Sequence, residues 1–183
     1  MDDQILDKVR CPSRYIGNEV NAVKKVLSSL DVTVALAFPD IYEVGMSHQG
    51  LKILYNILNG PEWLAAERVY SPWTDMEEEL RKSGNPLSTL ESGRCLGDFD
   101  ILGFSLQHEL SYTNVLTMLD LSGIPFLSEE RDDSFPLIIA GGPACFNPEP
   151  IADIFDESES ELIISGSETN ELIFSTAGIK YRK

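Results

Sequence analysis

Three segments of the sequence are rich in residue types that bind or react with small molecules. Each follows an apolar run and contains Gly, Ser, His or Asn: residues 39–50, 105–114 and 141–149. Loops of this kind are costly to order unless they form a site, so they are the first candidates for function.

Two histidines and two carboxylates are the candidate reactive groups. His48 stands at the start of a predicted helix, where free N–H groups favour anions and a neutral imidazole could bind a metal. A lone histidine is more often a surface or capping residue, and the same holds for His108. Asp40 and Glu43 share one loop, but no partner marks them as an acid/base pair, which favours solvated loop acids.

The pair Gly141-Gly142 follows an apolar run directly. Without a Cβ, the backbone there can be approached closely by a ligand. A tight turn between a strand and a helix explains the pair equally well. Both interpretations stay open at this point.

Composition excludes several classes of protein. The 183 residues include 30 acidic and 14 basic ones, a formal charge of −16, which disfavours binding to nucleic acid or to anionic membranes. The three cysteines are far apart, so neither a zinc site nor a disulfide framework is indicated. Neither a P-loop nor a G-x-G-x-x-G motif is present. With no signal peptide and no apolar run long enough for a membrane span, we expect a cytoplasmic protein.

Apolar runs that alternate with helical patterns indicate the fold. Val32–Phe38 is continuously apolar and β-branched, as in a strand buried on both faces. Three more strands are predicted, at residues 66–70, 100–105 and 136–140. Helices are predicted from a cap at Ser47, over Asp75–Lys82 and over Tyr112–Leu121. This alternation predicts an α/β fold, a doubly wound parallel sheet of flavodoxin-like (Rossmann-like) order with the second strand outside the first and the third beside it.

Both ends of the chain are expected to add elements to this core. An apolar stripe predicts a helix over Asn18–Leu30 within an N-terminal extension, residues 1–30. The α/β domain itself is expected over residues 31–156. A strand at 162–164 and a helix at 168–174 are predicted in the tail, residues 157–183.

In an open α/β sheet, ligands bind beyond the carboxyl ends of the strands. The three loops all follow strands, so they are expected to meet at this single rim. The proposed site exists only if the three loops lie side by side at this edge of the sheet.

Several long motifs in the chain resemble a known family. They lie at residues 38–55, 67–76, 99–116, 139–143 and 147–150. Together they resemble the N-terminal, cobalamin-binding-like domain of a family of radical S-adenosylmethionine (SAM) proteins, over about residues 10–156.

This resemblance implies a cofactor site on the three loops. Cobalamin-binding domains hold the corrin and its nucleotide tail with a D-x-H-x-x-G loop, a serine-containing segment and a Gly-Gly pair. Asp40 and Gly45 fit the first frame, but Tyr42 stands where the histidine would be, and axial ligation by a histidine is not implied. The implied cofactor-binding residues are Asp40, Gly45, Ser47, His48, Ser105, Gln107, Gly141, Gly142 and Pro143.

The family's radical chemistry depends on a C-x-x-x-C-x-x-C motif that binds a [4Fe–4S] cluster. Cys11, Cys95 and Cys145 cannot form it. We therefore expect no such cluster and no catalysis by this chain alone, with residues 157–183 altered or truncated.

The leading interpretation is a cobalamin-binding-like module whose partners are the cofactor and a radical SAM domain in cis or in trans. The alternative is a module without cofactor that mediates an interaction or presents a substrate. A flavin-binding domain is a third alternative, which the lack of a Ser/Thr-rich phosphate loop disfavours.

Overall fold

Mostly apolar runs form four of the five strands of a parallel sheet in the computed structural model, which describes residues 3–159, 172–174 and 179–181. The five strands lie in the order β2-β1-β3-β4-β5. Their bounds are Val32–Phe38 (β1), Leu64–Tyr70 (β2), Ile101–Ser105 (β3), Leu137–Gly141 (β4) and Glu157–Glu159 (β5). Every pair in this sheet is parallel, so the predicted α/β fold of flavodoxin-like order is confirmed.

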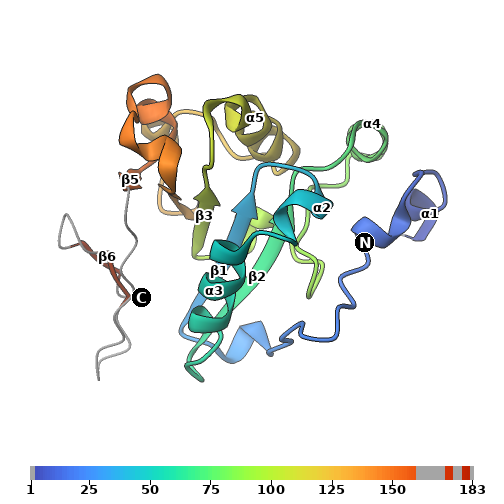
Figure 1. Ribbon diagram of the computed structural model, residues 1–183, viewed down its shortest axis with the longest axis horizontal. Helices are drawn as coiled ribbons and strands as arrows, with labels where there is room; N and C mark the ends of the chain where they lie inside the picture. The colour runs from blue at the N-terminus through green and yellow to red at the C-terminus, as the bar shows by residue number, and fades with distance from the viewer. Residues whose placement is uncertain (1–2, 160–171, 175–178, 182–183) are drawn as a thin grey trace.

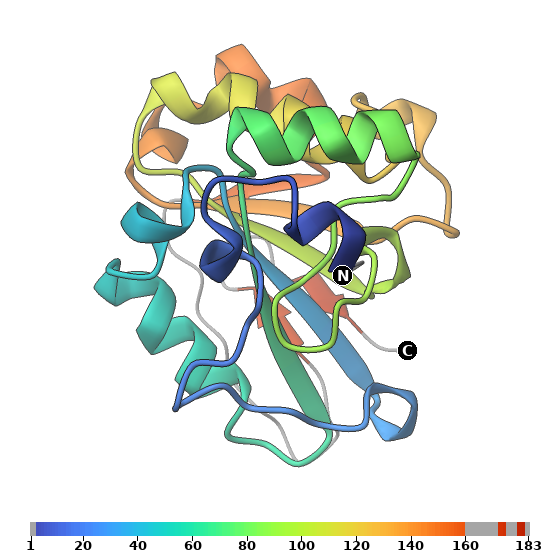
Figure 2. The ribbon, with the colours of Figure 1, turned by 90° about the vertical axis from the view of Figure 1, so that its right-hand side faces the viewer.

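Helices cover both faces of the sheet (Figure 1). The long ones are Gln49–Leu58 (α3), Thr74–Ser83 (α4) and Tyr112–Leu121 (α5). Figure 2 shows α4 and α5 together on one side of the sheet and α3 on the other. Short elements complete the chain: α1 (Asp3–Leu6), α2 (Tyr42–Gly45), and the 3-10 turns η1 (Pro12–Arg14), η2 (Leu27–Ser29), η3 (Leu96–Asp98), η4 (Glu109–Ser111), η5 (Ser128–Glu130), η6 (Pro143–Phe146) and η7 (Glu149–Ile154).

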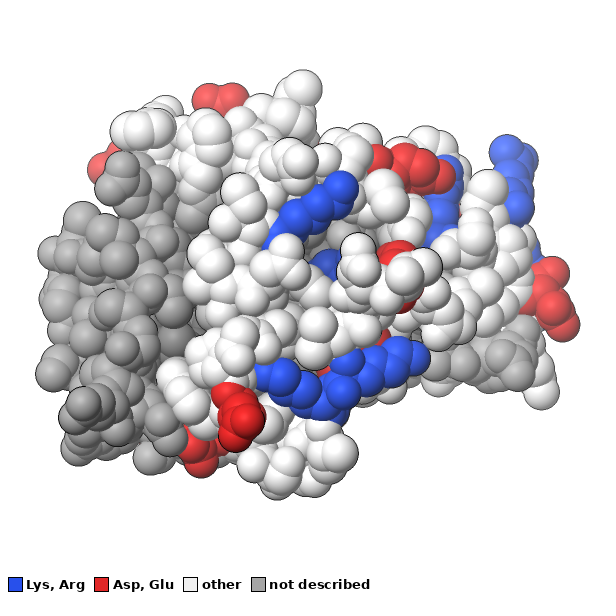
Figure 3. All heavy atoms as spheres, turned by 60° about the horizontal axis from the view of Figure 1, so that its bottom comes forward, with Lys and Arg blue, Asp and Glu red and all other residues white. Residues whose placement is uncertain are grey.

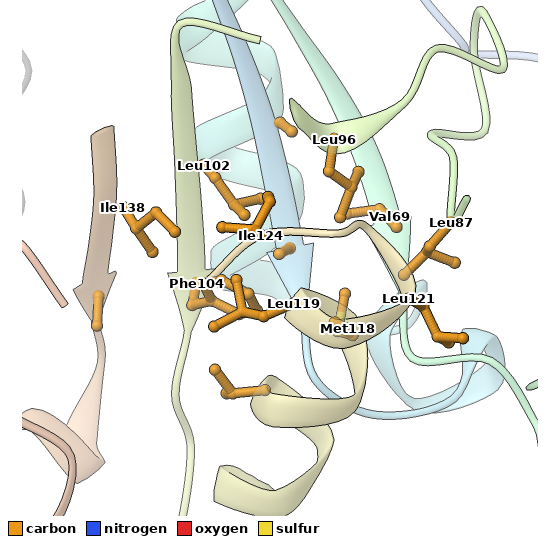
Figure 4. Packing of buried hydrophobic residues seen from close by; sticks show 14 of the residues in the cluster. Val69, Leu87, Leu96, Leu102, Phe104, Met118, Leu119, Leu121, Ile124 and Ile138 are labelled. Carbon is orange, nitrogen blue, oxygen red and sulfur yellow. The ribbon is translucent and has the colours of Figure 1, made fainter. Parts of the chain in front are cut away.

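Two apolar clusters hold these layers together. The larger lies under α4 and α5, where Leu102 and Phe104 of β3 contact Met118 and Leu119 of α5 within one buried group (Figure 4). The smaller lies under α3 and includes Leu36, Leu51 and Tyr55. Burial of each aliphatic side chain contributes about 1.5–3 kcal/mol, so the sheet is held firmly from both sides and its carboxyl edge is a fixed platform.

The helix predicted over Asn18–Leu30 is wrong. Residues 18–26 form no helix, and only Leu27–Ser29 makes a 3-10 turn. Tertiary contacts hold this segment instead, because the Lys25 ammonium donates to the carbonyls of Asn59, Pro61 and Leu64, where α3 ends. Val20 is 100% and Val26 71% exposed, whereas Val23 and Leu27 pack against the core, so the residues of the stripe do not share one buried face.

The tail differs from its prediction as well. Leu172–Phe174 was expected in a helix but forms strand β6, paired antiparallel with β7 (Ile179–Tyr181). The strand expected at 162–164 lies outside the described residues. Strand β5 continues the sheet past residue 156, and the three-part division of the chain stays a prediction.

Charge is distributed unevenly over the surface. The face in Figure 3 carries clusters of Lys and Arg, with acidic groups between them and wide uncharged areas. Among the helices that the structure describes, none combines the length and apolar character needed to cross a membrane.

Candidate functional site

Strand register brings the predicted loops to one edge. Ala37 near the end of β1 lies opposite Phe104 of β3, and Ser105 lies opposite Gly141 of β4. The loops that follow these strands therefore begin side by side. A cavity of about 270 Å³ opens where the first two loops meet, lined by Phe38, Pro39, Asp40, Val44, His48, Ser105, Gln107, His108 and Ser111.

The first loop contributes an apolar wall and one carboxylate. Asp40 lines the cavity, and its Oδ1 accepts a hydrogen bond from the Ile41 N–H at 2.7 Å. Gly45 faces the opposite direction, because a Cβ at this position would collide with the Tyr70 ring. Ser47 is exposed and donates to the Val44 carbonyl, so neither Gly45 nor Ser47 lines the cavity.

His48 has a structural task at the cavity wall. It is the N-cap of α3, and its Nδ1 accepts a hydrogen bond from the Leu51 N–H at 3.2 Å. The cap predicted at Ser47 is therefore wrong by one residue. A neutral imidazole that accepts through Nδ1 carries its proton on Nε2, so neither nitrogen has a lone pair available to a metal.

The second loop supplies the polar wall. Ser105, Gln107, His108 and Ser111 all line the cavity, and the Ser111 hydroxyl donates to the His108 carbonyl at 2.7 Å. His108 is exposed, and no hydrogen bond from its side chain to the η4 backbone is present. It is the imidazole with the freest access to this cavity.

Asn114, in the first turn of α5, connects the two loops. Its Nδ2 donates to the Pro39 carbonyl at 2.9 Å, which bridges two segments 75 residues apart. Asn114, Phe38, Pro39, Val44 and Ser111 were not among the predicted site residues. Their position next to the predicted ones within the same loops was the available signal.

The third loop packs against the second instead of lining the cavity. The Leu106 N–H donates to the Gly141 carbonyl at 2.8 Å, and the Leu106 carbonyl accepts from the Ala144 N–H at 3.2 Å. Gly142 has φ +118°, and a Cβ there would collide with the Leu106 carbonyl oxygen. The group that approaches the glycine pair closely is thus the backbone of Leu106, a part of the protein itself. Pro143, the next residue along the chain, is exposed.

Apolar side chains project from all three loops at the rim. Leu110 is 86% exposed, Phe146 81% and Val44 44%. Isolated exposed apolar residues are ordinary, but these three lie on loops that leave the same edge of the sheet and give that edge apolar groups that an apolar partner could contact; of the three, only Val44 also lines the cavity. We call Val44, Leu110 and Phe146 the rim residues.

Tyr42 occupies the position that the resemblance assigns to a histidine. Its hydroxyl donates to Glu19 Oε1 at 2.9 Å, and its ring meets that of Tyr70 edge-on. Burial and this bond to a carboxylate raise the pKa of Tyr42 to about 12. The hydroxyl is therefore protonated at neutral pH and committed to Glu19, which leaves no metal ligand at this position.

The described residues fit a cobalamin-type cofactor in part. Within residues 3–159, no group of three or more His, Cys, Asp and Glu side chains is arranged to hold a metal ion. A cavity of about 270 Å³ is smaller than the ~300–1,000 Å³ that encloses drug-sized ligands, and a corrinoid is larger still. The cavity could take one substituent of such a ligand, whereas at Gly142 the space that a Cβ would need is already occupied by the Leu106 carbonyl oxygen.

Comparison with known proteins agrees with the radical SAM part of the resemblance seen in the motifs. The family profile described as "Radical SAM proteins, N-terminal" matches residues 50–167. No curated protein and no solved structure matches the chain. The matched segment begins in α3, runs through the second and third loops and continues past β5.

Proposed function

The chain belongs to the radical SAM proteins, as an N-terminal region of that family, and on this premise we propose that it is an accessory module that binds a bulky cofactor at its rim. Cobalamin is the proposed cofactor. The single observation that carries the proposal is the cavity of about 270 Å³ between the first two loops, whose wall holds both apolar and polar side chains.

The side chains around the cavity have distinct tasks in this proposal. Apolar groups on the rim would contact the flat face of the ligand, where burying apolar area contributes about 25 cal/mol per Å². Gln107 and Ser105, both half-buried at the cavity wall, would donate to or accept from an amide substituent. When bound, cobalamin supplies a cobalt centre that can carry an alkyl group, whereas the residues of this chain bind and orient the ligand.

In this proposal, no histidine side chain of the protein needs to bind the metal of the cofactor. Nδ1 of His48 is engaged by the α3 backbone, and Tyr42 is held by Glu19. Only His108 could reach a bound metal from the described loops. We therefore propose that the cofactor is held by its ring and substituents, without a ligand from the first loop.

Titration with hydroxocobalamin tests this function. Saturable binding, seen by calorimetry and by a change in the visible spectrum, is expected for the wild type. Gln107→Ala should weaken binding by about tenfold, since one hydrogen bond in a partly buried site is lost. Ser47→Ala, one residue from His48 but outside the cavity, is the matched control and should bind as the wild type does. Absence of saturable binding at high micromolar hydroxocobalamin would contradict the cofactor proposal.

A second candidate function rests on a different observation. Leu110 and Phe146 are exposed by 86% and 81%, which leaves two large apolar side chains available for a protein partner. In this case the chain is an interaction module that docks on a radical SAM catalytic domain in cis or in trans. Sedimentation of the chain with such a domain should reveal a complex that Leu110→Ser weakens, whether or not cobalamin is present.

A further inference from the structure

The first loop is attached to the N-terminal extension by side chains. The Arg14 guanidinium Nε lies 2.8 Å from Glu43 Oε1, and Glu19 accepts the Tyr42 hydroxyl at 2.9 Å. Both Tyr42 and Glu43 belong to α2, the four-residue helix between β1 and the cavity wall. We call residues 14–19 the strap.

The strap is itself anchored to the edge of the sheet. Arg68 of β2 donates from Nη2 to Glu19 Oε2 at 3.0 Å, and its Nε lies 2.6 Å from the fully buried Glu91. At the other end of the strap, the Tyr15 hydroxyl accepts from the Trp73 N–H at 3.1 Å, just before α4. The strap therefore joins α2 to strand β2 and to the segment that precedes α4.

Helix α2 needs such an attachment. A single turn of helix is not stable in isolation, because fixing its residues costs more than its few hydrogen bonds return. Of its four residues only Gly45 is buried, while Glu43 and Val44 are exposed. Packing therefore holds α2 mainly through Gly45 and the Tyr42 ring, so the position of Tyr42 decides the position of the helix.

The two links between strap and helix differ in strength. The Glu43 side chain is 52% exposed, so its pair with Arg14 is screened by water and contributes little. Glu19 and Arg68 are only 23% and 13% exposed, and a hydrogen bond to a charged group in such surroundings is stronger. The link from Glu19 to Tyr42 should dominate.

We propose that Glu19 is a positioning residue that holds α2, and with it the cavity wall formed by Val44 and His48, through the Tyr42 hydroxyl. This role goes beyond the proposed function, since it concerns the shape of the cavity and requires no ligand. Any ligand of the cavity would nevertheless depend on it.

Amide hydrogen exchange of the full chain tests the proposal directly. The reporters are the N–H groups of Val44, Gly45 and Met46, which bond to the Ile41 and Tyr42 carbonyls within α2. In Glu19→Ala, and in Tyr42→Phe, which removes only the hydroxyl, these amides should exchange about tenfold faster, while amides of β1 and α5 keep their wild-type rates. Arg81→Gln, which removes the ion pairs of α4 with Glu77 and Asp120, is the matched control and should leave α2 unchanged.

Two results would overturn the role of Glu19. One is wild-type exchange at Val44, Gly45 and Met46 in both variants, and the other is an equal acceleration in β1, which would mean general destabilisation. Hydroxocobalamin binding is measured in parallel. If the wild type does not bind it, the proposed function fails, but the exchange rates still decide the role of the strap.

Discussion

At the scale of single residues, Gly142 shows how a motif residue can serve the fold. Its φ of +118° disfavours any side chain, and the Leu106 carbonyl oxygen occupies the space that a Cβ would need. Gly142→Ala should lower the free energy of unfolding by about 2 kcal/mol or more, because strain and collision add. Urea denaturation measures this.

Gly84 provides the matched control for this prediction. Its φ is +72°, but no atom lies within 4 Å of an added Cβ. Gly84→Ala should therefore cost only about 1 kcal/mol, from the left-handed backbone alone. Equal losses in the two variants would show that the contact with Leu106 adds nothing.

Tyrosine ionisation gives a second prediction at this scale. Burial first, and then the bond to Glu19, raises the pKa of Tyr42 from 10.0 to about 12, and burial raises that of Tyr55 to about 12. A group whose pKa is higher in the folded state stabilises the fold fully below its unfolded pKa. That contribution is lost as the pH rises from about 10 towards about 12. The free energy of unfolding should therefore fall over this range.

Tyr42→Phe isolates the share of one side chain in this pH dependence. The variant has no phenol to ionise at position 42, so its stability should fall less steeply between pH 10 and 12 than that of the wild type. Absorbance of tyrosinate in the folded variant should correspondingly show fewer tyrosines that ionise above pH 10 than in the wild type. Parallel stability curves for the two proteins would contradict the assignment.

At the scale of elements, a loop covers the edge of the sheet that strand β2 forms. Strand β2 is the outermost strand on its side, and its Arg68 carbonyl accepts from the Leu90 N–H at 2.9 Å. Glu91 in the same loop accepts from both the Arg68 N–H and the Arg68 Nε. Such a cover removes unpaired backbone groups that would otherwise recruit another strand.

The Arg68–Glu91 pair yields a prediction about this cover. Glu91 is fully buried, so Glu91→Ala leaves the Arg68 charge with only the partly exposed Glu19 as partner. The variant should lose about 3 kcal/mol of unfolding free energy. The double variant Arg68→Met, Glu91→Leu should recover part of it, since both charges of this pair are then absent and Glu19 keeps the Tyr42 hydroxyl as its partner. Chemical denaturation of the three proteins checks this, and a double variant less stable than Glu91→Ala would contradict it.

At the scale of the whole molecule, the four strands β1 to β4 could be predicted because they are short and mostly apolar, whereas β5, with the sequence Glu-Ser-Glu, carries no such pattern and was not predicted. Val32–Phe38 was predicted with its observed bounds, and α5 likewise, since local pattern and tertiary burial agree there. The course of segment 18–30 could not be predicted. It depends on hydrogen bonds from Lys25 to the backbone that follows α3, and no sequence periodicity relates these residues.

The candidate site was predictable to the level of its loops. Parallel topology places residues 39–50 and 105–114 at one edge, and the cavity lies between them. Which side chains face it depends on caps and on packing between loops. His48 rather than Ser47 caps α3, and Leu106 fills the space beside Gly142, so the cavity excludes the glycine pair that the motifs suggested.

Net charge and the apolar rim together predict how the molecule associates. A formal charge of −16 repels a second copy at low ionic strength, whereas at about 1 M salt the Debye length is only about 3 Å and this repulsion is screened. The exposed Leu110 and Phe146 should then drive reversible self-association, which sedimentation velocity would detect as a rise in mean mass.

Two double variants locate the surface responsible. Leu110→Ser with Phe146→Ser should stay monomeric in high salt, because the apolar area at the rim is lost. Ile53→Ser with Ile57→Ser removes two exposed apolar side chains of α3, 57% and 51% accessible, and should associate as the wild type does. If the α3 variant alone abolished association, the surface responsible would be the exposed face of α3 and not the rim.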